Sequence, residues 1–259
     1  MARPENIDFV FKSQQIAGVH YPAVQNAKAS VLLNHGFSVT RTGVGRAFVD
    51  LARDLTSAGC NVFAFDRLGH GESAGRFMDV NVPDELEQLS AMLDYVRAKT
   101  EGPVHVLGHS LGGMESACLA ARRADDIASL TLWAAAAVFV DDIRNNEIQG
   151  KSLDPLYETG VFDFEGQSLG PKFIETAREF DPFEGLERFS APVFLHQGEA
   201  DKVVPMKYAE RYAEIWSENA SLYRYPDADH GWNSLAERTL LLQRTVADIA
   251  GLATGHPHS

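Results

Sequence analysis

The sequence contains few cysteines and no long apolar run. Cys60 precedes a predicted strand and Cys118 lies within a predicted helix, so both are interpreted as small buried apolar side chains, and no disulfide framework is indicated. A membrane-spanning helix needs about 18 consecutive apolar residues, and no such run occurs. Residues 1–6 also lack the apolar core of a secretory signal. We therefore expect a cytoplasmic protein without membrane partners.

Basic residues are also scarce, because 23 Lys and Arg stand against 36 Asp and Glu and give a formal net charge of −13. Phosphate binding needs a basic face, so this balance argues against nucleic acids and anionic membranes as partners. His256 and His258 are interpreted as part of a loose tail and not as metal ligands. We expect no metal ion and no organic cofactor, and a monomer or homodimer that acts on a small molecule.

Short apolar runs alternate with segments of helical periodicity along most of the chain. The first two runs, residues 7–11 and 16–21, predict an antiparallel hairpin. Strands are also predicted at 30–34, 61–65, 104–108, 129–134, 192–196 and 221–225, and helices at 44–57, 86–96, 111–122, 206–216 and 235–250. This alternation predicts an α/β fold with a mostly parallel, eight-stranded sheet flanked by helices and with its chemistry at the carboxyl ends of the strands.

One segment interrupts this alternation, because residues 138–186 separate two predicted strands by far more than a crossover helix requires. Its aromatic residues are Phe139, Tyr157, Phe162, Phe164 and Phe173. This aromatic content argues against disorder. We therefore predict a core formed by residues 1–137 and 187–259 and an inserted cap subdomain at 138–186, with a peripheral decoration as the alternative.

Residues 104–113 combine an apolar strand with a serine between two glycines, Gly108 and Gly112. In a tight strand-to-helix turn, glycines leave room where side chains would clash, and the serine is strained with its hydroxyl exposed. Ser110 is therefore the predicted nucleophile, and the N–H of Leu111 at the start of the helix is a predicted oxyanion donor. The motif alone is only moderately specific, since many such matches are plain turns.

A serine hydroxyl near neutral pH needs a base within hydrogen-bond reach and a third group that orients the base. On this architecture the acid follows one late strand and the histidine follows the next. Asp201 and His230 occupy these positions and are the predicted acid and base. Weaker candidates for the acid are Glu199, Asp227 and Asp229, the last of which is adjacent to the histidine.

The loop after the first buried strand is expected to supply a second oxyanion donor. This loop has the sequence His35-Gly36-Phe37, and the N–H of Phe37 is the candidate. An ordinary turn is the alternative for these residues alone. Their position relative to Ser110 favours the functional interpretation.

Together these motifs resemble the α/β-hydrolase superfamily over nearly the whole chain, and more closely the small bacterial feruloyl (cinnamoyl) esterases. The similarity is carried by residues 35–37, 66–73, 75–77, 108–113, 198–205 and 229–230. The resemblance implies a cap that shapes the acyl pocket, with Asp142 and Gln149 near the phenolic end of the substrate. Where the family can present a cap tyrosine to the phenol hydroxyl, this chain has Phe173, and Leu111 stands where glutamine is common.

The predicted function is hydrolysis of carboxylic esters by a serine esterase that forms an acyl-enzyme, with the resemblance implying hydroxycinnamoyl (feruloyl-type) esters. A general short-chain or monoacylglycerol-type esterase shares the same residues and differs only in the cap. A thioesterase is disfavoured because coenzyme A is anionic and the predicted cap has few basic residues. The alternative from another class is a catalytically silent binding protein, disfavoured because Ser110, Asp201 and His230 are all present.

Overall fold

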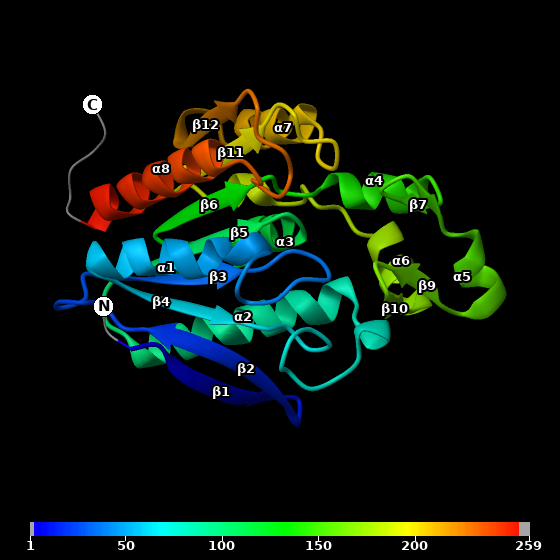
Figure 1. Ribbon diagram of the computed structural model, residues 1–259, viewed down its shortest axis with the longest axis horizontal. Coiled ribbons are helices and arrows are strands. Elements are labelled where there is room, and N and C mark those ends of the chain that lie inside the picture. The colour runs from blue at the N-terminus through cyan, green and yellow to red at the C-terminus, as the bar shows by residue number, and fades with distance from the viewer. Residues whose placement is uncertain (1–2, 254–259) are drawn as a thin grey trace.

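Residues 3–253 are described in this computed structural model, and they build a sheet with helices on both faces (Figure 1). The strands of the sheet are β1 (Glu5–Phe11), β2 (Gln14–Tyr21), β3 (Ala29–Asn34), β4 (Cys60–Phe65), β5 (Val104–His109), β6 (Ser129–Trp133), β11 (Val193–Gly198) and β12 (Ala220–Tyr225). Their order is β1-β2-β4-β3-β5-β6-β11-β12, with β1–β2 and β2–β4 antiparallel and the other neighbours parallel. The predicted mostly parallel, eight-stranded α/β fold is confirmed. His256 and His258 of the predicted tail lie outside the described residues.

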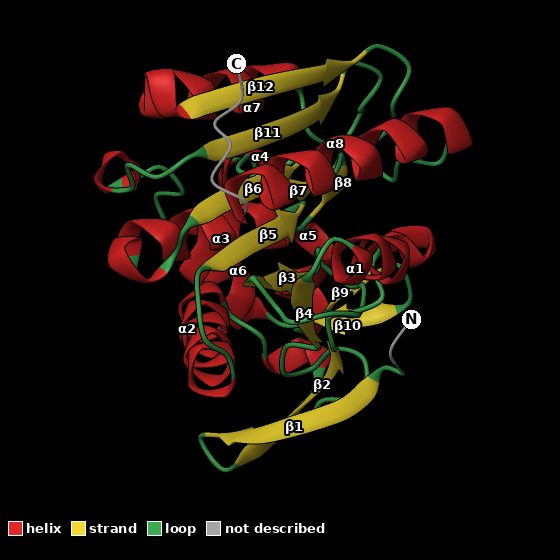
Figure 2. Cartoon of the chain, turned by 90° about the vertical axis from the view of Figure 1, so that its left-hand side faces the viewer, coloured by secondary structure: helices red, strands yellow, loops and turns green. Residues whose placement is uncertain are grey.

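The central strands are buried on both faces, because successive side chains of a strand point to opposite sides of the sheet. In β3, Val31 and Leu33 belong to one apolar cluster and Leu32 belongs to the other. Helices α1 (Ala47–Ser57) and α8 (Leu235–Ala253) cover one face, and α2 (Val82–Lys99), α3 (Leu111–Arg122) and α7 (Met206–Trp216) cover the other (Figure 2). Burial on both faces explains why these strands are continuous apolar runs.

The predicted helix at 44–57 is observed in two pieces, a 3-10 turn η1 (Val44–Arg46) and helix α1. Gly45 and Arg46 have φ angles of 55° and 67°, in the left-handed region, so the regular helix begins only at Ala47. The other 3-10 turns are η2 (Phe77–Asp79), η3 (Ala124–Asp126), η4 (Leu186–Arg188) and η5 (Ser217–Asn219).

Residues 138–186 form short elements beyond the ends toward which the parallel strands run (Figure 1). The elements are α4 (Val138–Arg144), β7 (Glu147–Ile148), β8 (Lys151–Ser152), α5 (Asp154–Thr159), β9 (Phe162–Phe164), β10 (Gln167–Leu169) and α6 (Pro171–Arg178). β7 pairs with β8 and β9 pairs with β10, both antiparallel. Phe139 and Phe173 share an apolar cluster with Phe77 and Leu111 from outside the segment. The segment is therefore packed against the start of α3, while its subdomain boundaries stay a prediction.

The turn from β5 into α3 contacts the loop after β3 so closely that no side chain fits between them. A Cβ built at Gly112 would lie 2.2 Å from the carbonyl oxygen of His35, and one built at Gly108 would lie 2.2 Å from the carbonyl oxygen of Gly112. Backbone atoms cannot move aside as the end of a flexible side chain would. Both glycines are thus required by close backbone approach.

We expect Gly112→Ala to destabilise the fold, because its methyl group would overlap the backbone of the loop after β3. The free energy of unfolding, measured by urea denaturation, should fall by about 3 kcal/mol, which is the upper end for overpacking. Gly160→Ala is the control, because it adds the same methyl group where nothing lies within 4 Å, at a φ of 77°. The control should lose about 1–2 kcal/mol from backbone strain alone. Equal losses in both variants would contradict the packing constraint.

Candidate active site

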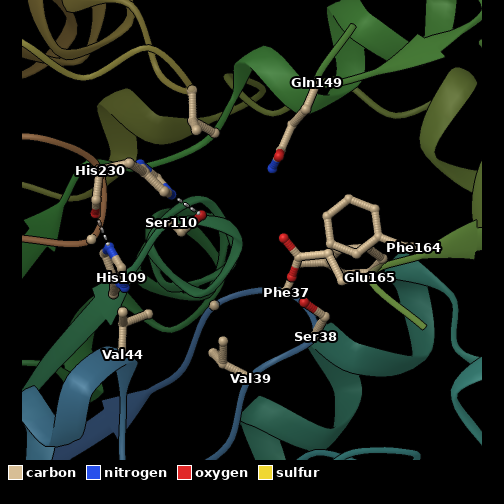
Figure 3. Close-up of a pocket in the computed structure, with 13 residues that line it drawn as sticks. Phe37, Ser38, Val39, Val44, His109, Ser110, Gln149, Phe164, Glu165 and His230 are labelled. Atoms are coloured by element: carbon tan, nitrogen blue, oxygen red, sulfur yellow. Dashed lines mark hydrogen bonds between the residues drawn. The ribbon is translucent and has the colours of Figure 1, made fainter. Parts of the chain in front are cut away.

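Three predicted residues from distant parts of the chain meet at the carboxyl edge of the sheet. His230 Nε2 lies 2.9 Å from Ser110 Oγ, a contact shown in Figure 3, and His230 Nδ1 lies 2.8 Å from Asp201 Oδ2. Ser110 stands at the start of α3, Asp201 follows β11 and His230 follows β12. Because β5, β6, β11 and β12 are neighbouring parallel strands, the segments that follow them emerge at one edge.

Ser110 has φ 57° and ψ −124°, a conformation that residues other than glycine rarely adopt. Its N–H donates to the carbonyl of Trp133 at 2.9 Å. Its own carbonyl accepts hydrogen bonds from the N–H groups of Gly113 and Ala136, both at 2.9 Å. The backbone around β6 and α3 thus holds the strained serine with its hydroxyl next to His230.

Asp201 is held by its own loop. Its Oδ1 accepts from the N–H groups of Val203 and Val204 at 2.8 Å, and its Oδ2 accepts from Gln197 Nε2 at 3.2 Å. Burial raises the pKa of Asp201, but the hydrogen bond from His230 and those from the loop lower it more, so the pKa lies below its ordinary value. An ionised carboxylate only accepts hydrogen bonds, so Nδ1 of His230 carries its proton and Nε2 accepts from the Ser110 hydroxyl.

The three weaker candidates for the acid do not take this place. The carboxylate of Asp229 accepts from Asn233, at 2.9 Å from the backbone N–H and 2.8 Å from Nδ2. Glu199 and Asp227 are exposed. Of the acidic candidates, Asp201 is therefore the one that the fold brings to the imidazole.

His109 contacts the loop that carries His230. Its Nε2 donates to the carbonyl oxygen of His230 at 3.0 Å, and the two rings have centroids 5.2 Å apart (Figure 3). Burial, with a smaller effect of His230, lowers the pKa of His109 to about 3, so this imidazole is neutral near pH 7. The position of His109 beside a glycine turn is typical of an imidazole that braces a loop, but the sequence contains no signal for its partner, because only the fold brings the two residues together.

The N–H groups of Phe37 and Leu111, the predicted oxyanion donors, lie close to the serine. Leu111 follows Ser110 directly, and a Cβ built at Gly36 would lie 3.2 Å from the Cβ of Ser110. Within residues 3–253, no group accepts a hydrogen bond from either N–H. Two unused donors beside a nucleophilic hydroxyl are suited to binding a developing oxyanion.

Two cavities adjoin Ser110. The larger has a volume of about 290 Å³, and its walls include Val44, His109, Phe164, Glu165 and His230 (Figure 3). The smaller has a volume of about 20 Å³, and its walls include Leu111, Ala136, Val138, Phe139 and Asp142. Phe37, Gln149 and Val203 line both cavities. Neither wall contains a lysine or arginine among the described residues.

The substrate residues implied by the resemblance have different positions in the fold. Asp142 and Gln149 line the smaller cavity, and Oδ2 of Asp142 accepts from the N–H of Gln149 at 3.1 Å. Burial raises the pKa of Asp142 above its ordinary value. Phe173 is fully buried and lines neither cavity, and its ring centroid lies 5.1 Å from those of both Phe37 and Phe139. The structure therefore leaves Phe173 behind the cavity wall, because its face of α6 packs inward.

Sequence reasoning missed Val44 and Glu165, which line the larger cavity from a 3-10 turn and from the turn between β9 and β10. Neither residue belongs to a recognisable motif, so the sequence contains no signal for them. Among residues 3–253, no three or more His, Cys, Asp and Glu side chains are grouped so that they could hold a metal ion. No helix in the same range combines the length and hydropathy needed to cross a membrane.

A mostly parallel sheet with a serine elbow after β5 and a Ser-His-Asp arrangement at its carboxyl edge defines an α/β-hydrolase. Residues 25–155 match the family described as "Serine aminopeptidase, S33". Human monoglyceride lipase is 36% identical over 238 residues, which cover 78% of this chain and 75% of that protein. The chain belongs to this α/β-hydrolase family and is a serine hydrolase of the esterase type.

Solved structures agree on the fold. Est1E from Butyrivibrio proteoclasticus, in a structure with ferulic acid bound, has a TM-score of 0.86 and 22% identity, covering 96% of this chain and 99% of that one. A monoacylglycerol lipase from Paleococcus ferrophilus has a TM-score of 0.71 and 19% identity, covering 91% and 98%. The superfamily recognised from the sequence is confirmed.

We expect Asp201→Asn to lower kcat by about 10⁴-fold, because a neutral amide does not hold the Nδ1-protonated form of His230. Asp229→Asn is the matched control, since it makes the same change beside His230 in a side chain that bonds Asn233. The kcat of both variants is measured for hydrolysis of p-nitrophenyl butyrate near neutral pH. A control that loses as much activity as Asp201→Asn would contradict the assignment of the acid.

Proposed function

We propose that this protein hydrolyses carboxylic esters through an acyl group carried on Ser110. The observation that carries the proposal is the 2.9 Å contact between Ser110 Oγ and His230 Nε2, with Asp201 2.8 Å from the other ring nitrogen. An imidazole in this position accepts the hydroxyl proton as the oxygen attacks the ester carbonyl. The Asp201 carboxylate stabilises the imidazolium that forms.

The negative charge of the tetrahedral intermediate develops on the former carbonyl oxygen. In this proposal the N–H groups of Phe37 and Leu111 bind that oxyanion. The bond to the alcohol oxygen then breaks as His230 returns the proton to the leaving alcohol, and the acyl group stays on Ser110. Water attacks the acyl carbonyl, His230 accepts its proton, and the same proton restores the serine hydroxyl as the acid leaves.

The chemistry of the reaction assigns the alcohol part and the acyl part of the ester to different cavities. The leaving alcohol must lie within hydrogen-bond reach of the base that protonates it, and His230 lines the larger cavity. The smaller cavity is lined by Ser110 and by Leu111, a proposed oxyanion donor, and not by His230. We therefore assign the alcohol to the larger cavity and the acyl group to the smaller one.

The size of the smaller cavity favours short acyl groups. Its volume of about 20 Å³ has room for about one water-sized group, next to the apolar side chains of Val138 and Phe139. We propose short acyl groups, of roughly two to four carbons counted with the carbonyl carbon at Ser110, because the close-packed walls leave little room for a longer chain. Human monoglyceride lipase is a relative, but the acyl chain of a fatty monoglyceride is much longer than this cavity.

The walls of the larger cavity favour a neutral alcohol. They mix the apolar Val44 and Phe164 with the polar Ser38 and Gln149, and Glu165 contributes a carboxylate. An anionic leaving group such as coenzyme A would meet no lysine or arginine side chain among the described residues of these walls. Phe139 and Asp142 in one cavity and Phe164 and Glu165 in the other come from residues 138–186, so we propose this segment as a cap that selects both parts of the ester.

A hydroxycinnamoyl ester is the second candidate substrate. The half-buried Asp142 in the smaller cavity favours it, with the exposed Gln149 beside it, because a phenol hydroxyl that leaves water needs a polar partner. The structural likeness to Est1E with ferulic acid bound also supports it. No tyrosine lines either cavity among the described residues, so Asp142 and Gln149 would supply that recognition alone.

We expect Ser110→Ala to lower ester turnover by about 10⁶-fold, as for other serine nucleophiles. The variant should also lose covalent labelling by a fluorophosphonate probe, which reads out the nucleophile by mass spectrometry. Wild-type protein that neither turns over p-nitrophenyl acetate nor takes the label would instead support a catalytically silent binding protein.

We expect kcat/KM to fall at least about tenfold from methyl butyrate to methyl octanoate and to methyl ferulate, because longer acyl groups exceed the smaller cavity. Val138→Ala should reduce this difference by widening that cavity. Val44→Ala removes the same atoms from the larger cavity and should leave acyl preference unchanged. If methyl ferulate is the best substrate, the hydroxycinnamoyl ester becomes the favoured substrate class. If Val44→Ala changes the acyl preference and Val138→Ala does not, the acyl group binds in the larger cavity and the alcohol in the smaller one.

A further inference from the structure

Arg67, in the segment after β4, has a completely buried side chain next to the loop that carries Phe37. Its Nε donates to Glu85 Oε1 at 2.9 Å, its Nη1 to the carbonyl of His35 at 2.7 Å and its Nη2 to the carbonyl of Gly36 at 3.1 Å. One guanidinium therefore connects helix α2 with two successive carbonyl groups of the loop after β3.

A second buried carboxyl group, that of Glu115 in α3, lies 3.3 Å from Nη1 of Arg67. Burial raises the pKa of Glu115 to about 8, although the nearby Arg67 opposes this change and Glu85 adds to it. Burial therefore favours the protonated form of Glu115, and Glu85 is the carboxylate that accepts the hydrogen bond from Nε of Arg67. In this fully buried environment, hydrogen bonds from the cation to carbonyl oxygens are strong.

The carbonyl of Gly36 and the N–H of Phe37 belong to the same peptide group. A trans peptide group is planar, with its C=O and N–H directed oppositely, so fixing one fixes the direction of the other. A hydrogen bond from a cation to the carbonyl also polarises the whole group and strengthens its N–H as a donor. Arg67 thus acts on the Phe37 N–H from the far side of the peptide.

His35 adds a second bond to the same carbonyl. The backbone N–H of Arg67 donates to His35 Nε2 at 3.1 Å, so this nitrogen has no proton. The proton is therefore on Nδ1, which donates to the carbonyl of Gly36 at 2.8 Å. Burial lowers the pKa of His35 well below its ordinary value, which keeps the ring in this neutral form.

The other proposed donor is held in a different way. The N–H of Leu111 shares a peptide group with the carbonyl of Ser110, which accepts backbone hydrogen bonds from Gly113 and Ala136. Among the described residues, the carbonyl of Gly36 accepts only from side chains, those of Arg67 and His35. The Gly36–Phe37 peptide group does not lie at the start of a helix, so side chains and not backbone hydrogen bonds orient it.

We propose that Arg67 is a positioning residue for the oxyanion hole, which orients and polarises the Gly36–Phe37 peptide group so that its N–H stabilises the transition state. This inference rests on the proposed ester hydrolysis. Lysine cannot replace arginine in this role, because a single ammonium group does not reach Glu85 and two backbone carbonyls in the geometry of a planar guanidinium.

The test compares Arg67→Met and Arg67→Lys with Gln88→Met as a matched control. Gln88, in α2, is also a buried polar residue. Its Oε1 accepts from the N–H of Leu68 at 2.7 Å and its Nε2 donates to Asp84 at 3.0 Å, and it has no hydrogen bond to residues 35–37 among the described residues. The melting temperature, kcat and KM for p-nitrophenyl butyrate are measured for each. Inhibition by a butyl trifluoromethyl ketone, whose serine adduct bears an oxyanion, is compared with inhibition by the methyl ketone of the same chain length.

Both Arg67 variants should lose about 10- to 100-fold in kcat with little change in KM, less than the roughly 10²–10³-fold cost of removing an oxyanion donor, because the Phe37 N–H itself remains. Inhibition by the trifluoromethyl ketone should weaken by a similar factor, and inhibition by the methyl ketone should not. Gln88→Met should lower the melting temperature and leave kcat nearly unchanged.

An unchanged kcat in a folded Arg67 variant would overturn the proposal, as would a loss of kcat that Gln88→Met reproduces at equal stability. Equal weakening of both ketones would assign Arg67 to general stability and also overturn it. If Arg67→Met does not fold, Arg67→Lys decides by the same criteria, because it keeps the buried charge opposite Glu85. A wild-type protein that hydrolyses no ester contradicts the proposed function itself, a result distinct from any of these.

Discussion

The close contact between the start of α3 and the loop after β3 is the constraint on which the active site depends. Gly112 allows the helix backbone to approach the carbonyl of His35, and Gly36 allows the loop to approach Ser110. Two N–H groups from separate strand ends are therefore brought beside one hydroxyl. Since these distances are set by backbone and not by flexible side chains, the arrangement needs little reorganisation when charge develops.

Buried hydrogen bonds surround this contact and keep it in one conformation. The strained backbone of Ser110 is held by bonds to Trp133 and Ala136, and the loop of His230 is held by His109. Arg67 holds the opposite side of the site from within the core. A sparsely populated backbone conformation persists only where its surroundings determine it in this way.

Aromatic side chains of the inserted segment pack around Phe37, which lies beside Ser110 and lines both cavities. The ring of Phe37 lies within 5.3 Å, centroid to centroid, of those of Phe139, Phe164 and Phe173. Phe37 lines both cavities, so the residue with a proposed oxyanion N–H is also part of the walls that meet the substrate. Substitutions in residues 138–186 are therefore expected to act on specificity through the position of this ring.

Much of the fold and of the active site can be predicted from patterns within short stretches of the sequence. Apolar period, glycine spacing and the order of motifs along the chain indicated the sheet, the elbow and the residues Ser110, Asp201 and His230, because parallel strands place successive loops at one edge. The exact start of α1, the burial of Phe173, the cavity position of Glu165 and the contacts of Arg67 had no such signal. They depend on which segments pack against one another, and the tertiary structure alone decides which side chains become neighbours and how much space is left between them.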